Sequence, residues 1–349
     1  MIDESFFSSS PSSITGLENK STTTISSVHS DILLNNILTR LDGPTLASTS
    51  CASTELYTLS TQQKLWSDIC HAVWPSTTHP HIRHIISSFP DGPRSFFSDA
   101  FPLLVPSSDP PKLQNFHRHE IEICSSPSEL ISAVDIHYKN EIVYSKVQTT
   151  ETLSGWFQYS PFRIDLLDPK FVVPTEIRFG NDSCRDLAEC LKLSWIVIDP
   201  TGRRAANLSS GGAVLVQQHW LTGEIELKFA TIMASGGNRD ELAESEIIVT
   251  CGGSQGGELH VTEVSLKMQD MDGSNLSGKD SLVILKNGML CGKRVAAQEE
   301  AGKKRYEEYL RIKKEREERK LRREGRLDAI CIGIGILVCC GLCMLAWFW

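Results

Sequence analysis

Apolar residues recur at helical spacing in residues 30–70, and this pattern predicts a group of short helices. Ile37, Leu38 and Leu41 fall on one face of the first helix, for which Ser30 is a suitable N-cap. The turn at residues 42–44 ends that helix, and Pro44 suits the first position of a second one. The later apolar anchors of the group are Leu46, Leu56, Leu59, Leu65, Trp66 and Cys70.

From about residue 140 to 290 the pattern changes to short runs rich in Val, Ile and aromatic residues, separated by turn sequences. Helical runs of 10–15 residues do not interleave with them, so they predict an antiparallel sandwich or barrel. The segment 125–134, in contrast, predicts a short capped helix. The predicted strands are IVYSKV (142–147), FRIDLL (162–167), LSWIVID (193–199), AVLVQQHW (213–220), EIELKFATIM (224–233), EIIVTCG (246–252), LHVTEVSLKM (259–268) and SLVIL (281–285).

Residues 294–326 predict one long, charged helix. Glu307 and Arg311 form one of several i,i+4 pairs in the favourable order, and few residues in this stretch are apolar. We therefore expect a solvated rod or spacer.

Residues 329–349 contain no charge and predict a membrane-spanning helix. A helix of 21 residues is about 31 Å long, close to the roughly 30 Å thickness of the hydrocarbon layer. The alternative is a buried core helix, but the segment is apolar all round and follows a polar rod. The basic residues before it would stay in the cytosol, so we expect a single-pass, tail-anchored protein whose domains face the cytosol.

Charge is distributed unevenly along the chain. The whole chain carries −8, residues 303–326 contribute +6 and Asp328 contributes −1, which leaves −13 for residues 1–302. An acidic body with one basic segment argues against a nucleic-acid-binding protein. The 11 cysteines are scattered or terminal and predict reduced thiols, and the first 13 residues, which are partly acidic, do not resemble a secretory leader.

Motifs that carry chemistry are nearly absent, so we expect no catalytic residues, metal or cofactor. His71, His79, His81 and His84 could form a ligand cluster, but a solvated loop explains them better. The glycine-rich stretch 252–257 lacks the ending of a phosphate-binding loop and fits a hairpin connection. Trp156, Trp195 and Trp220 lie in the strand region, where core packing is the default and stacking in a lectin-like pocket the alternative.

These patterns divide the chain into six parts. Residues 1–27 have a disordered composition, 28–74 form the helical group, and 75–119 form an irregular connector. A β-rich domain over 120–292, the charged helix over 294–326 and the span over 329–349 complete the chain. The fold class is α+β.

The helical group resembles an F-box. Its apolar skeleton matches at Leu34, Ile37, Leu38, Leu41, Leu46, Leu65, Trp66 and Cys70. The strand segments 193–204, 218–229 and 251–273 look like those of a small group of plant F-box proteins. Val28-His29-Ser30 replaces the usual Leu-Pro, and Leu56 replaces a common Trp, so these two sites can lower the affinity for a partner.

The resemblance implies that the helical group binds a Skp-type adaptor, through which a cullin–RING ligase is reached, while the strand domain recruits an unknown protein substrate. The chain would then be a non-catalytic substrate receptor of an SCF-type ubiquitin ligase. The adaptor-binding residues implied are Ile32, Leu34, Ile37, Leu38, Leu41, Pro44, Leu46, Leu65 and Trp66.

Two alternatives remain open. In the first, the helices are an appendage packed on the sandwich and bind no adaptor. The chain would then be a tail-anchored binding or scaffold protein, and its ligand could be a carbohydrate. The location can also be the cytoplasm or nucleus, if residues 329–349 do not enter a membrane.

Overall fold

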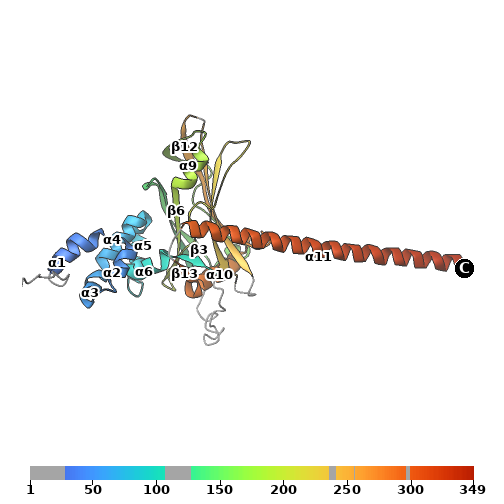
Figure 1. Ribbon diagram of the computed structural model, residues 1–349, viewed down its shortest axis with the longest axis horizontal. Coiled ribbons are helices and arrows are strands. Elements are labelled where there is room, and N and C mark those ends of the chain that lie inside the picture. The colour runs from blue at the N-terminus through green and yellow to red at the C-terminus, as the bar shows by residue number, and fades with distance from the viewer. Residues whose placement is uncertain (1–27, 107–126, 236–240, 255, 296–298) are drawn as a thin grey trace, which may run out of the picture. The chain divides into compact units, whose positions relative to one another are not determined.

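The computed structural model describes residues 28–106, 127–235, 241–254, 256–295 and 299–349 (Figure 1). Helices and sheets are mixed along the chain, as the sequence predicts. The chain divides into two compact units, one ending at Leu65 and one beginning at Trp66.

The first unit consists of short helices. A single turn, α1 (Ser30–Ile32), continues into a π-helix, η2 (Leu33–Ile37), and a 3-10 turn, η3 (Leu38–Arg40). Then follow α2 (Gly43–Thr49), α3 (Thr54–Ser60) and the first residues of α4 (Gln63–Val73). The break predicted at residues 42–44 is confirmed, because the Asp42 side chain caps α2 by accepting from Thr45 N at 2.9 Å.

The expected cap at Ser30 is wrong. The Nδ1 atom of His29 accepts from the backbone amide of Asp31 at 3.3 Å and caps α1. The Ser30 hydroxyl instead donates to Glu55 Oε1 at 3.2 Å, which ties α1 to α3.

Two sheets form the centre of the second unit. The first has seven strands, with the order β13-β1-β7-β6-β2-β3 and β8 paired to β6, and the second has six, with the order β4-β12-β11-β10-β9 and β5 paired to β12. Strand pairs are antiparallel except β1 with β7. The strands of the first sheet are β1 (Leu103–Val105), β2 (Glu129–Tyr138), β3 (Glu141–Glu151), β6 (Leu191–Asp199), β7 (Arg204–Asn207), β8 (Gly211–Gly212) and β13 (Lys293–Val295). Those of the second are β4 (Arg163–Asp165), β5 (Val173–Arg178), β9 (Leu215–Gln218), β10 (Ile225–Ala234), β11 (Leu242–Gly252) and β12 (Glu258–Asp270).

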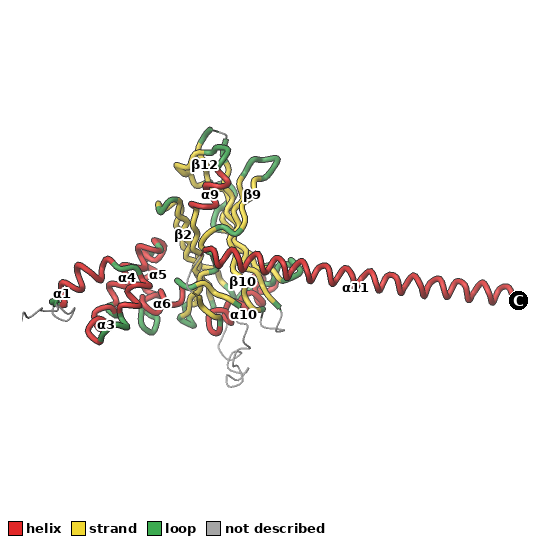
Figure 2. The backbone as a smooth tube through the Cα atoms, in the orientation of Figure 1, coloured by secondary structure: helices red, strands yellow, loops and turns green. Residues whose placement is uncertain are grey.

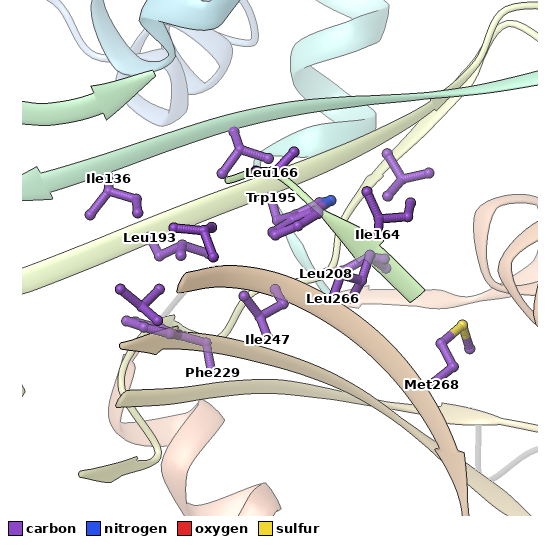
Figure 3. Close-up of a cluster of buried hydrophobic side chains, with 14 of the residues drawn as sticks. Ile136, Ile164, Leu166, Leu193, Trp195, Leu208, Phe229, Ile247, Leu266 and Met268 are labelled. Atoms are coloured by element: carbon purple, nitrogen blue, oxygen red, sulfur yellow. The ribbon is translucent and has the colours of Figure 1, made fainter. Parts of the chain in front are cut away.

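The two sheets share one apolar core. Figure 3 shows Trp195 of the first sheet on the opposite side of this core from Phe229 and Ile247 of the second. On β10 the residues at alternate positions 225, 227 and 229 are fully buried, which confirms the alternation seen in the sequence. The sheets therefore pack face to face.

The helix predicted at 125–134 is wrong where the structure describes it, because residues 129–138 form strand β2. Leu130, Val134 and Ile136 enter the shared core, while Ile131 and Ala133 are buried on the opposite face. A strand buried on both faces shows no alternation, so its apolar run can be mistaken for a helical one.

The strand predicted at 281–285 is also wrong, because it lies within helix α10 (Gly278–Cys291). The Ser277 hydroxyl accepts from Asp280 N at 3.2 Å and caps this helix. Leu282, Leu285 and Met289 recur at helical spacing and are buried. Two shorter helices, α8 (Gly155–Tyr159) and α9 (Ser183–Cys190), also interrupt the strand region.

The connector expected to be irregular is largely helical. It contains a 3-10 turn, η4 (Pro75–Thr78), followed by α5 (Pro80–Ser87) and α6 (Pro93–Ala100). Each element begins with proline, which suits the first turn of a helix because no backbone N–H is needed there. Residues 107–119 of the connector lie outside the described part of the chain.

The rod and the apolar terminal segment form one continuous helix, α11 (Glu299–Phe348) (Figure 2). The helix begins at Glu299 and not at the predicted residue 294, because Lys293–Val295 pair with β1 as strand β13.

Candidate functional site

A π-turn determines which apolar residues of the first unit face outward. The backbone N–H of Leu38 bonds the carbonyl of Leu33, five residues earlier. Residues five apart therefore lie nearly above one another in this segment, and Leu33 and Leu38 are both buried. Ile32 and Ile37, also five apart, remain 50% and 46% exposed.

The resemblance-based residues fall into two groups by exposure. Leu38, Leu46, Leu65 and Trp66 are buried, so their first role is to hold the fold together. Ile32, Ile37 and Pro44 are exposed, and Leu34 and Leu41 are half-buried. We call Ile32, Leu34, Ile37, Leu41 and Pro44 the outer apolar set.

The sequence did not separate these two groups, because it predicts an α-helix where the structure has a π-turn. Under α-helical spacing, Ile37, Leu38 and Leu41 would share one face, whereas Leu38 faces inward and Ile37 outward. Leu33 was missed as a core residue for the same reason. Leu56, which stands where the resembling proteins often have Trp, is buried.

In the second unit, Trp66 of α4 and Trp74, the residue that follows α4, pack on the Phe97 ring of α6. The rings of Trp66 and Phe97 are 5.3 Å apart, and those of Trp74 and Phe97 are 5.4 Å apart. The Cys70 thiol donates to Pro93 O at 3.7 Å, and burial raises its pKa to about 12, so it is not a reactive thiolate.

A buried carboxylate joins this aromatic layer to the first sheet. Asp135 on β2 accepts from Ser76 N at 2.8 Å, from Ser76 Oγ at 2.5 Å and from Ser145 Oγ at 2.6 Å. Burial raises the pKa of Asp135, and the hydrogen bonds from Ser145 and Ser76 oppose that rise. The bonds connect η4, β2 and β3.

A second buried carboxylate, Asp99 at the end of α6, binds two arginines of the same sheet. Its Oδ2 lies 3.1 Å from Arg204 Nε, and its Oδ1 lies 3.5 Å from Arg294 Nη2. The backbone N–H of Ala205 also donates to Oδ2 at 3.2 Å. Asp99 therefore connects α6 with β7 and β13.

Two of the three tryptophans assigned to core packing are exposed. Trp195 is fully buried, as expected, and its Nε1 donates to Ser132 Oγ at 3.1 Å. Trp156 on α8 is 80% exposed and Trp220 in the β9–β10 turn is 88% exposed, so core packing is wrong for both. They are candidate contact residues of the β-rich domain.

The base of α11 docks on the second sheet through an ion cluster and two tyrosines. Lys228 Nζ lies 2.9 Å from Glu244 Oε1 and 2.6 Å from Glu246 Oε1, and sits over the Tyr306 ring. Burial lowers the pKa of Lys228, but the two carboxylates more than reverse this and raise it overall. Tyr306 and Tyr309 are buried in an apolar cluster with Val214, Ala230, Ile232 and Met271.

The distal part of α11 is the one helix in the described part of the chain that is long and apolar enough to cross a membrane. This statement rests on length and composition, and none of its most apolar window is buried in the protein. The apolar side chains Ile332, Leu337 and Leu342 are all exposed.

The histidines of the sequence HPHIRH lie on or beside α5, not in a loop, and His79, His81 and His84 are exposed. Among the described residues, no group of three His, Cys, Asp or Glu side chains is arranged to hold a metal ion. The loop at 252–257 connects β11 and β12, as a hairpin connection should.

Three proteins of Arabidopsis thaliana are similar to this chain over nearly its full length. "F-box protein At2g27310" is 46% identical over 329 residues, which cover 89% of this chain and 93% of that protein. "Probable F-box protein At2g36090" is 44% identical, covering 90% of each chain, and "F-box protein At3g44326" is 42% identical, covering 90% of this chain and 88% of its own. No protein-family model and no solved structure matches the chain.

We expect Asp99→Ala to destabilise the protein by about 3 kcal/mol, because it leaves Arg204 and Arg294 without their buried acidic partner. The matched control is Asp165→Ala, which breaks an exposed pair with Arg163 and should cost less than about 1 kcal/mol. Denaturant unfolding of the full chain in mild detergent measures both. An equal loss of unfolding free energy in the two variants would show that Asp99 stabilises the protein no more than an exposed ion pair does.

Asp135 should make stability depend on pH with a defined sign. Its folded-state pKa is raised, so the folded protein holds this proton to higher pH than the unfolded chain. The contribution of Asp135 is therefore fully present below the unfolded pKa and is lost as pH rises through the folded pKa. Relative to Asp135→Asn, wild type should lose stability over that window, measured by unfolding midpoints at stepped pH. If the difference in stability between wild type and Asp135→Asn does not change with pH, Asp135 does not titrate in this way.

Proposed function

This chain belongs to the plant F-box proteins, and from that premise we propose that it is a substrate-recognition subunit of an SCF-type ubiquitin ligase, attached to a membrane by α11 with its folded parts in the cytosol. In this role it performs no chemistry itself. The helical group of residues 28–74 binds a Skp-type adaptor, which connects it to a cullin–RING core. The β-rich domain of residues 120–292 presents the protein substrate.

The observation that carries the adaptor proposal is the outer apolar set. Ile32 and Ile37 are large apolar side chains about half exposed to water, and their segment buries Leu33 and Leu38 instead. Exposed apolar residues gathered on one short helical segment are typical of a surface that a partner covers. Leu34 and Leu41 are half-buried and Pro44 is exposed, so these three are also open to contact.

The membrane proposal is supported by the exposed apolar half of α11 and by the 12 basic residues in 303–326 that precede it. Basic residues flanking a span favour the cytosolic side. The buried rings of Tyr306 and Tyr309, with Lys228 over the Tyr306 ring, hold the base of the helix on the second sheet, so the helix and the β-rich domain would be held together at the membrane.

A second candidate function is a tail-anchored binding protein that recognises carbohydrate without an adaptor. The exposed indole of Trp220, whose ring stacks on His219 at 6.5 Å, favours it, because such a ring can stack on a sugar. A glycan array probed with the full chain and with Trp220→Ala tests this. Binding that requires Trp220, together with no capture of the adaptor, would replace the ligase proposal.

The double variant Ile32→Asp with Ile37→Asp should bind a Skp-type adaptor at least about 30-fold more weakly than wild type, the factor expected when a central contact worth about 2 kcal/mol is lost. Because both side chains are exposed, the fold should survive. Titration of the adaptor against the detergent-solubilised full chain measures this affinity.

The matched control is Val283→Asp with Leu290→Asp on α10, whose side chains are 48% and 46% exposed. It should bind the adaptor like wild type. Substitution of Leu38 is not informative here, since Leu38 is buried and its loss would report on folding. Wild-type binding by the Ile32 and Ile37 variant, or no binding by wild type, would refute the adaptor proposal.

Deleting residues 327–349 should convert a carbonate-resistant membrane protein into a soluble one. Orientation can be read from glycosylation after the protein is inserted into microsomes. Asn275, an exposed sequon residue, should stay bare, while a sequon in a C-terminal extension should be modified. A glycan on Asn275 would place the body in the lumen, and carbonate-resistant attachment after the deletion would remove α11 as the anchor.

A further inference from the structure

Charge changes abruptly along α11. Residues 299–318 carry seven basic and seven acidic side chains, so the part of the helix next to the folded body is neutral overall. Residues 319–326 carry five basic side chains and a single acid, Glu324. The excess positive charge of the helix is therefore concentrated in residues 319–326, which Leu327 and Asp328 separate from the uncharged segment.

Four arginines in these two turns form one stripe. Arg319, Arg322, Arg323 and Arg326 follow the spacing i, i+3, i+4 and i+7, which places them on one face of the helix. All four are exposed. Arg322 pairs with Glu318 at 3.3 Å, whereas the other three have no ion pair among the residues that the structure describes. We call these four residues the arginine stripe.

The stripe lies between the folded body and the apolar segment. An ion pair of Arg316 with Asp272, at 3.5 Å, lies near the distal end of the part of α11 that docks on the body. Arg326 is three residues before Ala329, or about 4.5 Å along the axis of a helix. If the uncharged segment spans a bilayer, the guanidinium groups nearest to it reach the depth of the lipid phosphates.

We propose that the arginine stripe binds the phosphate groups of anionic lipids in the leaflet from which α11 enters the membrane. This inference rests on the proposed membrane attachment. Guanidinium groups match phosphate because their planar N–H donors bond two oxygens at once. Lipid is the partner because the stripe and the span are parts of one uninterrupted helix (Figure 2), so the same insertion brings the arginines to the headgroups.

The length of α11 keeps the acidic body away from the anionic lipid surface that the arginine stripe would contact. Residues 1–302 carry −13 and would be repelled by an anionic surface. From Arg316 to Ala329 the helix rises about 20 Å, roughly two and a half times the Debye length of about 8 Å at physiological salt. The repulsion of the body is therefore largely screened, while the attraction of the stripe at the surface is not.

The test uses the full chain in bilayer nanodiscs that contain phosphatidylcholine and a minor fraction of phosphatidylserine. After extraction, the two lipids that remain bound to the protein are quantified by mass spectrometry. The variant Arg319→Gln with Arg323→Gln and Arg326→Gln removes the three stripe residues without an ion pair. The control, Lys303→Gln with Lys304→Gln and Lys314→Gln, removes the same charge from the neutral part of the helix.

Wild type and the lysine control should retain phosphatidylserine enriched roughly fivefold over the bulk, the factor that corresponds to about 1 kcal/mol. In the stripe variant, the retained lipids should have the same ratio of phosphatidylserine to phosphatidylcholine as the nanodisc. Raising the ionic strength from about 0.1 M to about 1 M shortens the Debye length from about 10 Å to about 3 Å and should remove the enrichment.

Three results would overturn the inference: equal enrichment in the stripe variant and wild type, equal loss in the lysine control, or loss on adding inorganic phosphate at matched ionic strength. The last result would indicate a site for free phosphate. Carbonate extraction of wild type separates the two proposals. If wild type resists carbonate extraction but retains no excess phosphatidylserine, only the lipid-binding proposal for the arginine stripe is contradicted. If carbonate extracts wild type, the proposed attachment by α11 is contradicted.

Discussion

Two buried aspartates determine how the second unit is put together. Asp135 binds η4 through Ser76, and Asp99 binds β7 and β13 through Arg204 and Arg294. Each carboxylate needs these partners because an unpaired buried charge is costly. The elements η4 and α6 are therefore held against the first sheet. The described part of the segment predicted as an irregular connector packs on the β-rich domain as an outer layer.

The same unit is attached at a second place to the helix that leaves it. The buried rings of Tyr306 and Tyr309, with Lys228 over the Tyr306 ring, hold the base of α11 on the second sheet. Beyond this base the helix continues without interruption into its apolar half. In the proposed function, the β-rich domain and α11 would move together at the membrane, and this would favour substrates held close to the same membrane.

Much of this organisation could be predicted from local patterns, and the exceptions have physical causes. The alternation along β10 and the proline-marked break at Pro44 depend on near neighbours, and both were predictable. Strand β2 was not predictable because both of its faces are buried, and α10 was not because a short apolar run at 281–285 fits a strand as well as a helix. The outward position of Ile37 depends on a π-turn, and helical spacing alone does not reveal a π-turn.

The central claim is that the outer apolar set is where a Skp-type adaptor binds. Hydrogen exchange of the full chain, with and without that adaptor, tests it most directly. The account predicts slower exchange in residues 31–46 on adding the adaptor, with the sheets of the β-rich domain unchanged. Protection confined to the β-rich domain, or no protection anywhere at saturating adaptor, would contradict it.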